Sequence, residues 1–290
     1  MNASLIKELR DISGAGMMDC KKALEENGND IKKATEWLRE KGIAKAAKKA
    51  GRVAAEGLSK IAVDGNKAVI LEINCETDFV AKNEKFQKFV SDVADILLSS
   101  NASTMDEALA LPCEDGTLKD YVTNMTATIG EKIDFRRFKL VNKEQDENFG
   151  AYVHMGGKIS VLTILKGASE EVAKDVSMHA AAMRPEFVKK SEVPEDRLES
   201  EKKILTEEVI RSGKPAEIAE KIVMGKLNKF YKEVCLEEQE FVKDNSVTVG
   251  KYVSNNGGSI IDVIRFEVGE GIEKRQENFA EEVAAQMKGE

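Results

Sequence analysis

The side chains that could carry out chemistry are few in this chain and lie far apart. The sequence holds 2 histidines and 4 cysteines, and no two cysteines have the Cys-x-x-Cys spacing of a zinc or redox motif. No Gly-x-Ser-x-Gly motif supplies the nucleophile of a hydrolase. We therefore expect reduced thiols, no metal site, no cofactor and no covalent catalysis, so function is sought in binding surfaces. The six residues are Cys20, Cys75, Cys113, Cys235, His154 and His179.

A pair of methionines marks the first candidate surface. Met17 and Met18 follow the loop Gly14-Ala15-Gly16 and begin a short predicted helix. Both cannot face the core of so small a helical segment, so one of them offers a soft contact surface. The alternative is that both cover the edges of the loop, and the residue types favour neither interpretation.

The segment Thr77-Asp78-Phe79-Val80 is the second candidate. An aromatic ring beside an acid, between a strand and a helix, is either a helix cap with its hydrophobic staple or an exposed wedge. Residue types alone favour the cap, because phenylalanines in loops usually pack against the protein. His179 lies in an alanine-rich helical segment and is predicted to be a packing histidine rather than a base.

Charge is unevenly distributed along the chain. The 290 residues carry 44 basic and 52 acidic side chains, a net charge of −8, whereas residues 1–54 carry 12 basic and 8 acidic ones. The excess comes from residues 41–52, which are rich in lysine and alanine and contain no acid. Such a stretch indicates either nucleic acid binding or a solvated helix end or linker. We interpret it as a linker, because no aromatic side chains are interleaved to stack on bases.

Helical spacing dominates the first 40 residues. Apolar residues recur at the helical period from Leu5 to Ile12, and a second helix is expected at about residues 17–26. Gly28 ends that helix and Asp30 can cap a third. Three helices of this size form a core near the lower limit for independent folding, which is typical of a module that holds a partner.

The pattern then changes to strands. Residues 61–74 predict a hairpin around the turn Asp64-Gly65-Asn66, and a helix follows whose apolar stripe runs from Phe86 to Leu97. A strand at about residues 135–141 closes this unit.

The same order recurs further along. Residues 151–165 predict a hairpin around Gly156-Gly157, and a helix at residues 170–183 follows it. We interpret the recurrence as an internal structural repeat of two similar α+β halves.

A pair of long amphipathic helices interrupts the second half. They occupy residues 194–234 and are joined by the turn Ser212-Gly213-Lys214-Pro215, which predicts an antiparallel hairpin that projects or mediates self-association. A short helix at 247–254, a strand at 259–268 and a last helix at 279–287 complete the chain.

The predicted fold class is α+β. Its parts are a three-helix domain with a basic linker, a core of two subdomains with antiparallel sheets, an inserted helical hairpin and a C-terminal helical module. The corresponding ranges are residues 1–54; 55–143; 144–193 with 233–268; 194–232; and 269–290. No apolar run approaches the roughly 20 residues of a membrane span, and the first residues lack the pattern of a signal peptide, so we expect a cytoplasmic protein.

Several long segments with little internal repetition carry a family resemblance. They read LR at 9–10 with SGAGMMDCKKAL at 13–24, EINCETDFVA at 72–81, MHAA at 178–181, PEF at 185–187, SGKP at 212–215 and RFEVGEG at 265–271. In this order, over nearly the whole chain, they resemble the signatures of the bacterial elongation factor Ts family. Ser13 stands where that family commonly has Thr and Arg184 where it commonly has Lys, and neither difference touches the expected mechanism.

The resemblance implies an exchange factor and not an enzyme. Such factors bind elongation factor Tu, a translational GTPase, in its GDP-bound and nucleotide-free states and promote GDP release. The resemblance also implies a ubiquitin-associated-like fold for the first three helices. It puts Thr77, Asp78, Phe79 and Val80 at the magnesium site of the GTPase, which reverses the interpretation of Phe79 as a packed residue. We expect further partner contacts at Arg10, Met17, Met18 and His154.

Two other function classes are compatible with single features of the sequence. An RNA-associated protein would use the basic stretch, but the net negative charge and the lack of aromatic side chains count against it, so we expect no direct nucleic acid partner and no membrane partner. A ubiquitin-binding adaptor would use the three-helix domain but would leave the large core unexplained. Self-association through the helical hairpin stays open.

Overall fold

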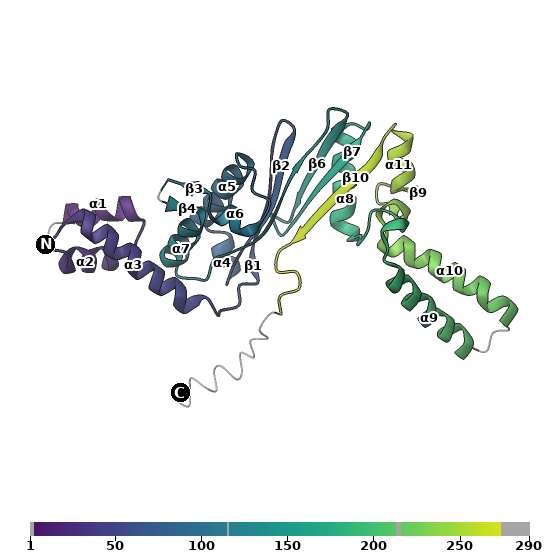
Figure 1. The fold of residues 1–290 in the computed structure, drawn as a ribbon, viewed down its shortest axis with the longest axis horizontal. Helices are drawn as coiled ribbons and strands as arrows, with labels where there is room; N and C mark the ends of the chain where they lie inside the picture. Colours follow the sequence, from purple (N-terminus) through teal and green to yellow (C-terminus); the bar gives the residue numbers. More distant parts are fainter. Residues whose placement is uncertain (1–2, 115, 213–215, 274–290) are drawn as a thin grey trace. The chain divides into compact units, whose positions relative to one another are not determined.

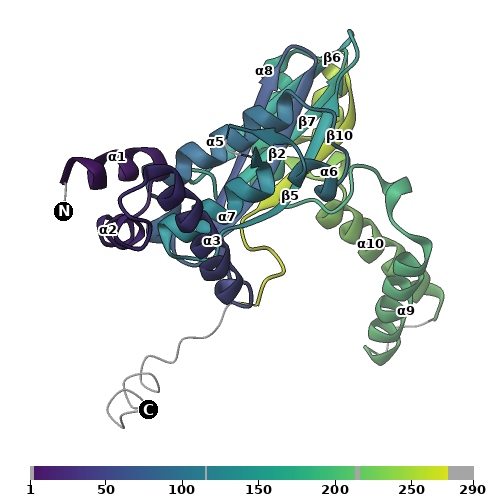
Figure 2. The same ribbon diagram turned by 60° about the vertical axis from the view of Figure 1, so that its left-hand side comes forward.

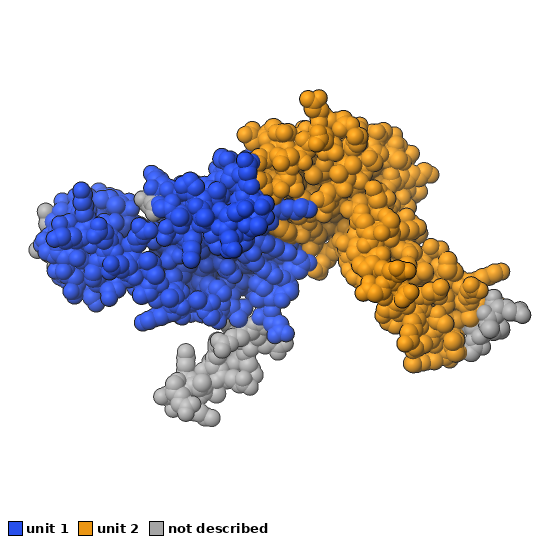
Figure 3. All heavy atoms as spheres, in the orientation of Figure 1, with its two compact units in different colours: residues 1–60, 71–139, 267–290 blue, residues 61–70, 140–266 orange. Residues whose placement is uncertain are grey.

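The computed structural model describes residues 3–114, 116–212 and 216–273. The chain divides into two compact units, which Figure 3 distinguishes by colour. Residues 1–60, 71–139 and 267–290 belong to the first unit, and residues 61–70 and 140–266 belong to the second. The predicted last helix, at 279–287, lies outside the described residues, as does most of the predicted C-terminal module. The five predicted domain ranges stay predictions, because compactness does not test which segments fold independently.

Three helices open the first unit: α1 (Ala3–Ser13), α2 (Met17–Glu26) and α3 (Ile31–Lys49). Their small core is made by Leu9, Cys20, Ala23, Leu24 and Ala34, with Trp37 and Leu38 packed against it. Asp30 caps α3 by accepting a hydrogen bond from the Lys33 amide at 3.1 Å. The three predicted helices and the predicted cap are confirmed.

The predicted basic linker is wrong over most of its length. α3 continues through the lysine-rich stretch to Lys49 instead of ending near Leu38. Alanine and lysine favour the helix, and the only early breaker, Gly42, is buried where an added Cβ would lie 3.1 Å from the Ala127 side chain. The close approach at Gly42 allows α3 to pack along α7 (Leu118–Ile129), so most of the linker belongs to the folded unit.

A three-stranded sheet forms the core beside these helices. Its order is β1–β2–β5, with β1 (Glu56–Asp64) and β2 (Lys67–Cys75) joined at the predicted turn and β5 (Asp134–Asn142) next to β2. Gly65 takes a φ of +56° in that turn, a conformation in which glycine is unstrained.

Four helices and a small hairpin accompany this sheet. The helices are α4 (Asp78–Ala81), α5 (Glu84–Leu98), α6 (Met105–Leu109) and α7, and β3 (Pro112–Cys113) pairs with β4 (Gly116–Thr117). α5 buries the predicted stripe, and α5 and α7 lie side by side in Figures 1 and 2. The Phe89 and Tyr121 rings meet edge to face between them, with centroids 4.7 Å apart.

The second unit is built on the sheet β10–β7–β6. β6 (Glu147–His154) and β7 (Ile159–Lys166) form the predicted hairpin in antiparallel register, and β10 (Ser259–Glu267) lies on the other side of β7. α8 (Glu170–Met183) crosses β6 at Gly150, where an added Cβ would lie 2.2 Å from the Ala173 carbonyl. The helix therefore approaches the sheet at a point that admits only glycine.

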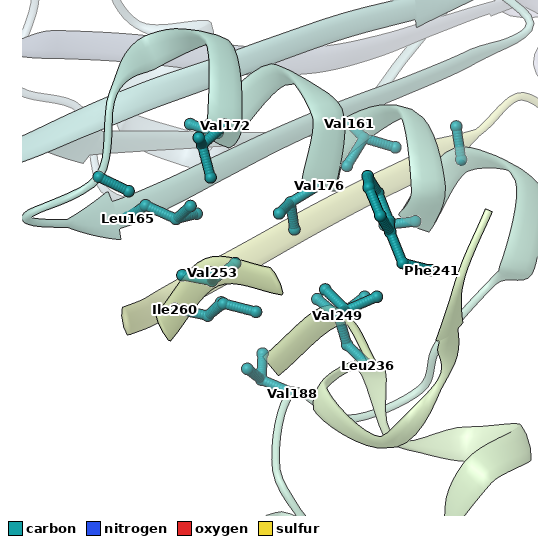
Figure 4. Packing of buried hydrophobic residues seen from close by; sticks show 14 residues of the cluster. Val161, Leu165, Val172, Val176, Val188, Leu236, Phe241, Val249, Val253 and Ile260 are labelled. Carbon is teal, nitrogen blue, oxygen red and sulfur yellow. The ribbon is translucent and has the colours of Figure 1, made fainter. Parts of the chain in front are cut away.

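Short elements close the core of this unit. They are the 3-10 turns at Lys190–Glu192 and Leu236–Glu238, the strands β8 (Glu240–Phe241) and β9 (Asp244–Thr248), and α11 (Val249–Asn255). The predicted helix at 247–254 begins two residues later, because Thr248 caps α11 by accepting from the Lys251 amide. Figure 4 shows how Val172 and Val176 pack with Val249 and Val253.

The predicted helical hairpin is present as α9 (Glu195–Arg211) and α10 (Ala216–Val234). Val209, Val223 and Leu227 are buried, and Lys226 pairs with Glu208 at 2.6 Å. Four large apolar side chains of the pair stay exposed: Ile204, Ile210, Ile218 and Met224. The antiparallel α+β architecture predicted from the sequence is confirmed.

Candidate functional site

The segment 77–80 forms a short capped turn between β2 and α5. Thr77 is the N-cap of α4, and its hydroxyl accepts a hydrogen bond from the Val80 amide at 3.4 Å. Ala81, the last residue of α4, is buried and anchors the turn on the first unit. The cap predicted from the residue types is therefore formed.

The Phe79 side chain projects from this turn into solvent. It is 81% exposed, the highest exposure among the large apolar side chains of the described chain. The interpretation from residue types, in which the ring packs against the protein as a staple, is wrong. A four-residue helix capped by Thr77 directs the ring outward, and exposing so large an apolar group has no benefit for folding.

A negative charge lies next to this ring. Asp78 is half-exposed, and its carboxylate pairs with Lys82 one turn later at 2.7 Å. Such an exposed i, i+4 pair contributes only a few tenths of a kcal/mol to stability.

Glu131 holds the start of the turn from 54 residues further along the chain. Its carboxylate accepts the amides of Glu76 and Thr77 at 3.1 and 3.0 Å, and the Thr77 hydroxyl at 2.7 Å. Sequence reasoning missed this residue, because no local pattern connects an acid after α7 to a loop after β2.

The two longest sequence motifs meet beside the turn. A hollow of about 370 Å³ in the first unit is lined by Arg10, Gly14, Ala15 and Gly16 together with Val80, Asn83, Lys85, Thr128 and Ile129. The fold thus brings the predicted contacts Arg10 and Val80 to one place. Lys85 and Arg10 give this hollow a positive character.

The two methionines of the first motif are both at the surface. Met17 is 59% exposed and Met18 73% exposed, so neither is committed to the small helical core. This agrees with a soft contact surface at the start of α2, and their contact with a partner stays a prediction.

The motif at 265–271 has a structural role. Glu72 on β2 is fully buried and accepts from Arg136 at 3.1 Å, from Arg137 at 2.6 Å and from the Gly269 amide at 2.8 Å. An added Cβ at Gly269 would lie 2.3 Å from the Ala55 carbonyl, so glycine is required there. These contacts fix residues 267–271 on the first unit.

The two histidines have different environments, both in the second unit. His154 ends β6 at the surface, with its ring stacked on Tyr152 and its Nδ1 3.2 Å from the Tyr152 hydroxyl. Its predicted role as a partner contact stays a prediction. The exposed Val153 and Met155 lie on either side of it.

His179 is the packing residue that the sequence predicts. It is buried in α8, its Nδ1 accepts from the Val242 amide at 3.3 Å, and its Nε2 lies 2.9 Å from the Gln239 side-chain oxygen. Since Gln239 donates its own amide to the Glu233 carbonyl, the imidazole is neutral with its proton on Nε2. Burial lowers the pKa of His179, and the bond to Gln239 opposes that shift.

The described ranges, residues 3–114, 116–212 and 216–273, show neither a metal centre nor a membrane-spanning helix. No group of three or more His, Cys, Asp or Glu side chains there is arranged to hold a metal ion. Within the same ranges, no helix combines the length and apolarity needed to cross a membrane. All four cysteines, each within the described residues, are free thiols.

Comparison with known proteins agrees with the motifs. The family model described as "Elongation factor TS" matches residues 76–270. The chain is also 52% identical over 288 residues to "Elongation factor Ts" of Lactiplantibacillus plantarum (strain ATCC BAA-793 / NCIMB 8826 / WCFS1), covering 99% of each sequence. The chain belongs to the elongation factor Ts family. It is a translation elongation factor and takes part in protein biosynthesis. The family model begins at Glu76, so it includes the Phe79 turn and Glu131, while the relative also covers α1 to α3.

Proposed function

We propose that this elongation factor binds elongation factor Tu in its GDP-bound form and promotes release of GDP, so that GTP can bind. The observation that carries the proposal is the exposed Phe79 ring, held beside Asp78 on a capped turn in a chain of this family. The factor acts by binding and has no covalent chemistry of its own, so it is not an enzyme.

The mechanism follows from how a GTPase holds its nucleotide. Backbone amides, a P-loop lysine and Mg²⁺ contact the phosphates of GDP. An exchange protein that binds preferentially to a GTPase conformation in which these groups are displaced lowers the affinity of the GTPase for GDP. Because linkage is reciprocal, GDP weakens the binding of the exchange protein by the same ratio. GTP binding reverses the effect, and the factor leaves.

Phe79 suits the part of a wedge. Full burial of a phenylalanine side chain stabilises by about 1.5–3 kcal/mol, which corresponds to about a 10- to 100-fold change in an equilibrium constant. Because the ring is exposed in the free factor, nearly all of that free energy is available for binding. Asp78 would act beside it, by competing for the Mg²⁺ ion or its waters.

Other surfaces would extend this interface. Arg10 lines the hollow next to Val80, Met17 and Met18 are exposed in the same unit, and His154 would contact the partner from the second unit. Several separate contacts raise the affinity for one partner state more than any single contact does. A factor with this partner would act in the cytoplasm.

Self-association through α9 and α10 is a second interaction that the structure supports. The exposed Ile204 and Ile210 on α9, and Ile218 and Met224 on α10, provide apolar surface for a second copy. Sedimentation of the full chain, compared with a variant carrying Lys at Ile204 and Met224, tests this independently of exchange.

The two competing function classes have weaker support. Two of the lysines that suggested RNA binding are engaged within the protein, Lys45 with Asp19 at 3.0 Å and Lys49 with the Gly130 carbonyl at 2.5 Å. A ubiquitin-binding role would leave the Phe79 turn without a purpose. Titration with tRNA at low salt and with ubiquitin would detect either activity.

Release of fluorescent GDP from elongation factor Tu, with and without the factor, tests the proposal. We expect release to accelerate with the concentration of the factor and to reach a plateau. Phe79→Ala should lower that acceleration about tenfold or more when excess Mg²⁺ is present, and Asp78→Ala should act in the same direction more weakly. Unchanged release with the unsubstituted factor would refute the proposal.

A further inference from the structure

We propose that Glu131 is a positioning residue, which holds the turn 77–80 in the conformation that directs Phe79 outward. The proposal rests on the proposed function, because it concerns how the wedge is presented to the GTPase. Glu131 makes no contact with the partner and acts only through the turn.

The contacts of Glu131 use both of its carboxylate oxygens. Oε2 accepts the two consecutive amides of Glu76 and Thr77, and Oε1 accepts the Thr77 hydroxyl. Since the Thr77 proton is directed to Glu131, a lone pair of the same oxygen faces the Val80 amide and caps α4. Glu131 therefore orients the cap itself as well as the backbone before it.

A second set of contacts runs in the opposite direction. The Glu76 carboxylate accepts the Lys132 amide at 2.5 Å and pairs with Arg52 at 3.2 Å. Each of the two segments thus supplies a carboxylate that accepts amides of the other segment. We call this set of residues the clasp: Glu76, Thr77, Glu131 and Lys132. Charge-assisted hydrogen bonds of this kind are about twice as strong as neutral ones.

The segment that carries Glu131 is itself fixed on α7. Gly130 ends α7 with a φ of +87° and donates its amide to Thr126 at 3.0 Å. The buried Thr126 hydroxyl accepts the Ile133 amide at 3.1 Å, and Ile133 is buried in turn. Glu131 projects from a supported backbone, so it can act as a fixed point for the turn.

The turn needs such a fixed point. A helix of four residues is too short to be stable by its own hydrogen bonds, and an exposed phenylalanine ring favours any conformation that covers it. Without the clasp, the projecting conformation would be a smaller fraction of the free protein. The apparent affinity for the partner then falls by that fraction, whereas the complex, once formed, restores the conformation.

The experiment measures GDP release from elongation factor Tu over a range of factor concentrations. For Glu131→Ala, we expect the half-saturating concentration to rise about fivefold or more, with a plateau rate within about twofold of the unsubstituted factor. Glu131→Gln keeps one acceptor oxygen, so its half-saturating concentration should lie between those of the unsubstituted factor and Glu131→Ala.

Glu107→Ala is the matched control. The Glu107 carboxylate also accepts two consecutive amides, those of Ser103 and Thr104, and the Ser103 hydroxyl, but it does so at the N-terminus of α6. We expect this variant to leave both the half-saturating concentration and the plateau unchanged. In a Phe79→Ala background, Glu131→Ala should change the half-saturating concentration by less than about twofold, because the residue acts through the ring.

Hydrogen exchange of the free factor gives a readout that does not depend on activity. Glu131→Ala should speed exchange at the amides of Glu76, Thr77 and Val80, while Glu107→Ala should speed it at Ser103 and Thr104. If Glu131→Ala does not fold, as judged by circular dichroism, Glu131→Gln carries both arms of the test.

The outcomes separate the two hypotheses. An unchanged half-saturating concentration in Glu131→Ala would overturn the positioning role, whether or not the plateau rate is lowered. Equal effects of Glu131→Ala in the presence and absence of Phe79 would also overturn it. If the unsubstituted factor fails to accelerate GDP release, the proposed function is refuted. Separately, unchanged hydrogen exchange at the Thr77 amide in Glu131→Ala would show that the clasp does not hold the turn.

Discussion

The two halves of the core share one chain order, in which a hairpin is followed by a turn and then by a helix. The turns differ in whether they bury or expose their side chains. In the second half, the turn after β7 is closed: Ala168 is buried, its carbonyl accepts from the Asn148 side chain at 2.8 Å, and Ser169 caps α8. In the first half, the turn after β2 is also capped, by Thr77, yet it exposes an aromatic ring.

The difference lies two residues after each cap. There the second half has Glu171, an acid that suits the positive end of a helix, and the first half has Phe79, which does not. The turn of the second half therefore has the residue types that folding alone favours. The turn of the first half differs from that pattern at one side chain, Phe79. The residue that we propose as the wedge is therefore the one that departs from what folding alone favours at this position.

The largest expected effect separates two phenylalanines of the first half. Phe89 is fully buried against Tyr121, so Phe89→Ala should lower the free energy of unfolding by about 3–5 kcal/mol, whereas Phe79→Ala should change it by less than about 0.5 kcal/mol. Urea denaturation of both variants measures this difference. A large loss of stability in Phe79→Ala would mean that the ring packs in solution.

The next effect concerns the close approach of the second half. Gly150→Ala places a methyl group against the backbone of Ala173, and separating α8 from β6 should cost about 3 kcal/mol. Thermal unfolding checks the loss, and Gly225→Ala on α10, where an added Cβ meets nothing within 4 Å, is the control. Similar stability of the two alanine variants would contradict the packing described for α8.

A pH dependence should distinguish the helices that follow the two hairpins. α8 buries His179 with a lowered pKa, whereas the buried residues of α5 are all apolar. Because the unfolded chain binds the proton more tightly, His179 should cost stability as the pH falls below its ordinary value of about 6.5, by at most about 1.4 kcal/mol per pH unit.

His179→Gln isolates this contribution. The difference in unfolding free energy between the two proteins should depend on pH below about 6.5 and become constant above it. If the unfolding free energies of the unsubstituted protein and His179→Gln differ by the same amount at every pH at and below 7.5, His179 does not titrate in this way.

The smallest expected effect compares the two caps directly. Thr77→Ala and Ser169→Ala each remove a hydroxyl that accepts a helix amide, so each should cost about 1 kcal/mol of stability. Only Thr77→Ala should also slow GDP release from elongation factor Tu, because only that cap supports the Phe79 ring. Equal effects of the two variants on release would remove the functional distinction between the halves.

The sequence by itself determined what depends on neighbours along the chain. The apolar period of α5, the Asp64-Gly65 turn and the cap at Asp30 are local signals, and each predicted element formed. The motif around residues 72–81 was enough to indicate the family, since a long motif needs no tertiary information to be matched.

Only the tertiary structure decided the features that join distant residues. The lysine-rich stretch packs on α7 because Gly42 lies close to Ala127. Phe79 is exposed because no described part of the chain covers it, and Glu131 holds a turn 54 residues away. His179 is neutral because Gln239 and Val242, 60 and 63 residues further along the chain, form hydrogen bonds with its two ring nitrogens. Periodicity and propensity describe how a segment is shaped, but burial and hydrogen-bond partners depend on which segments meet, and that is fixed by the packing of the whole unit.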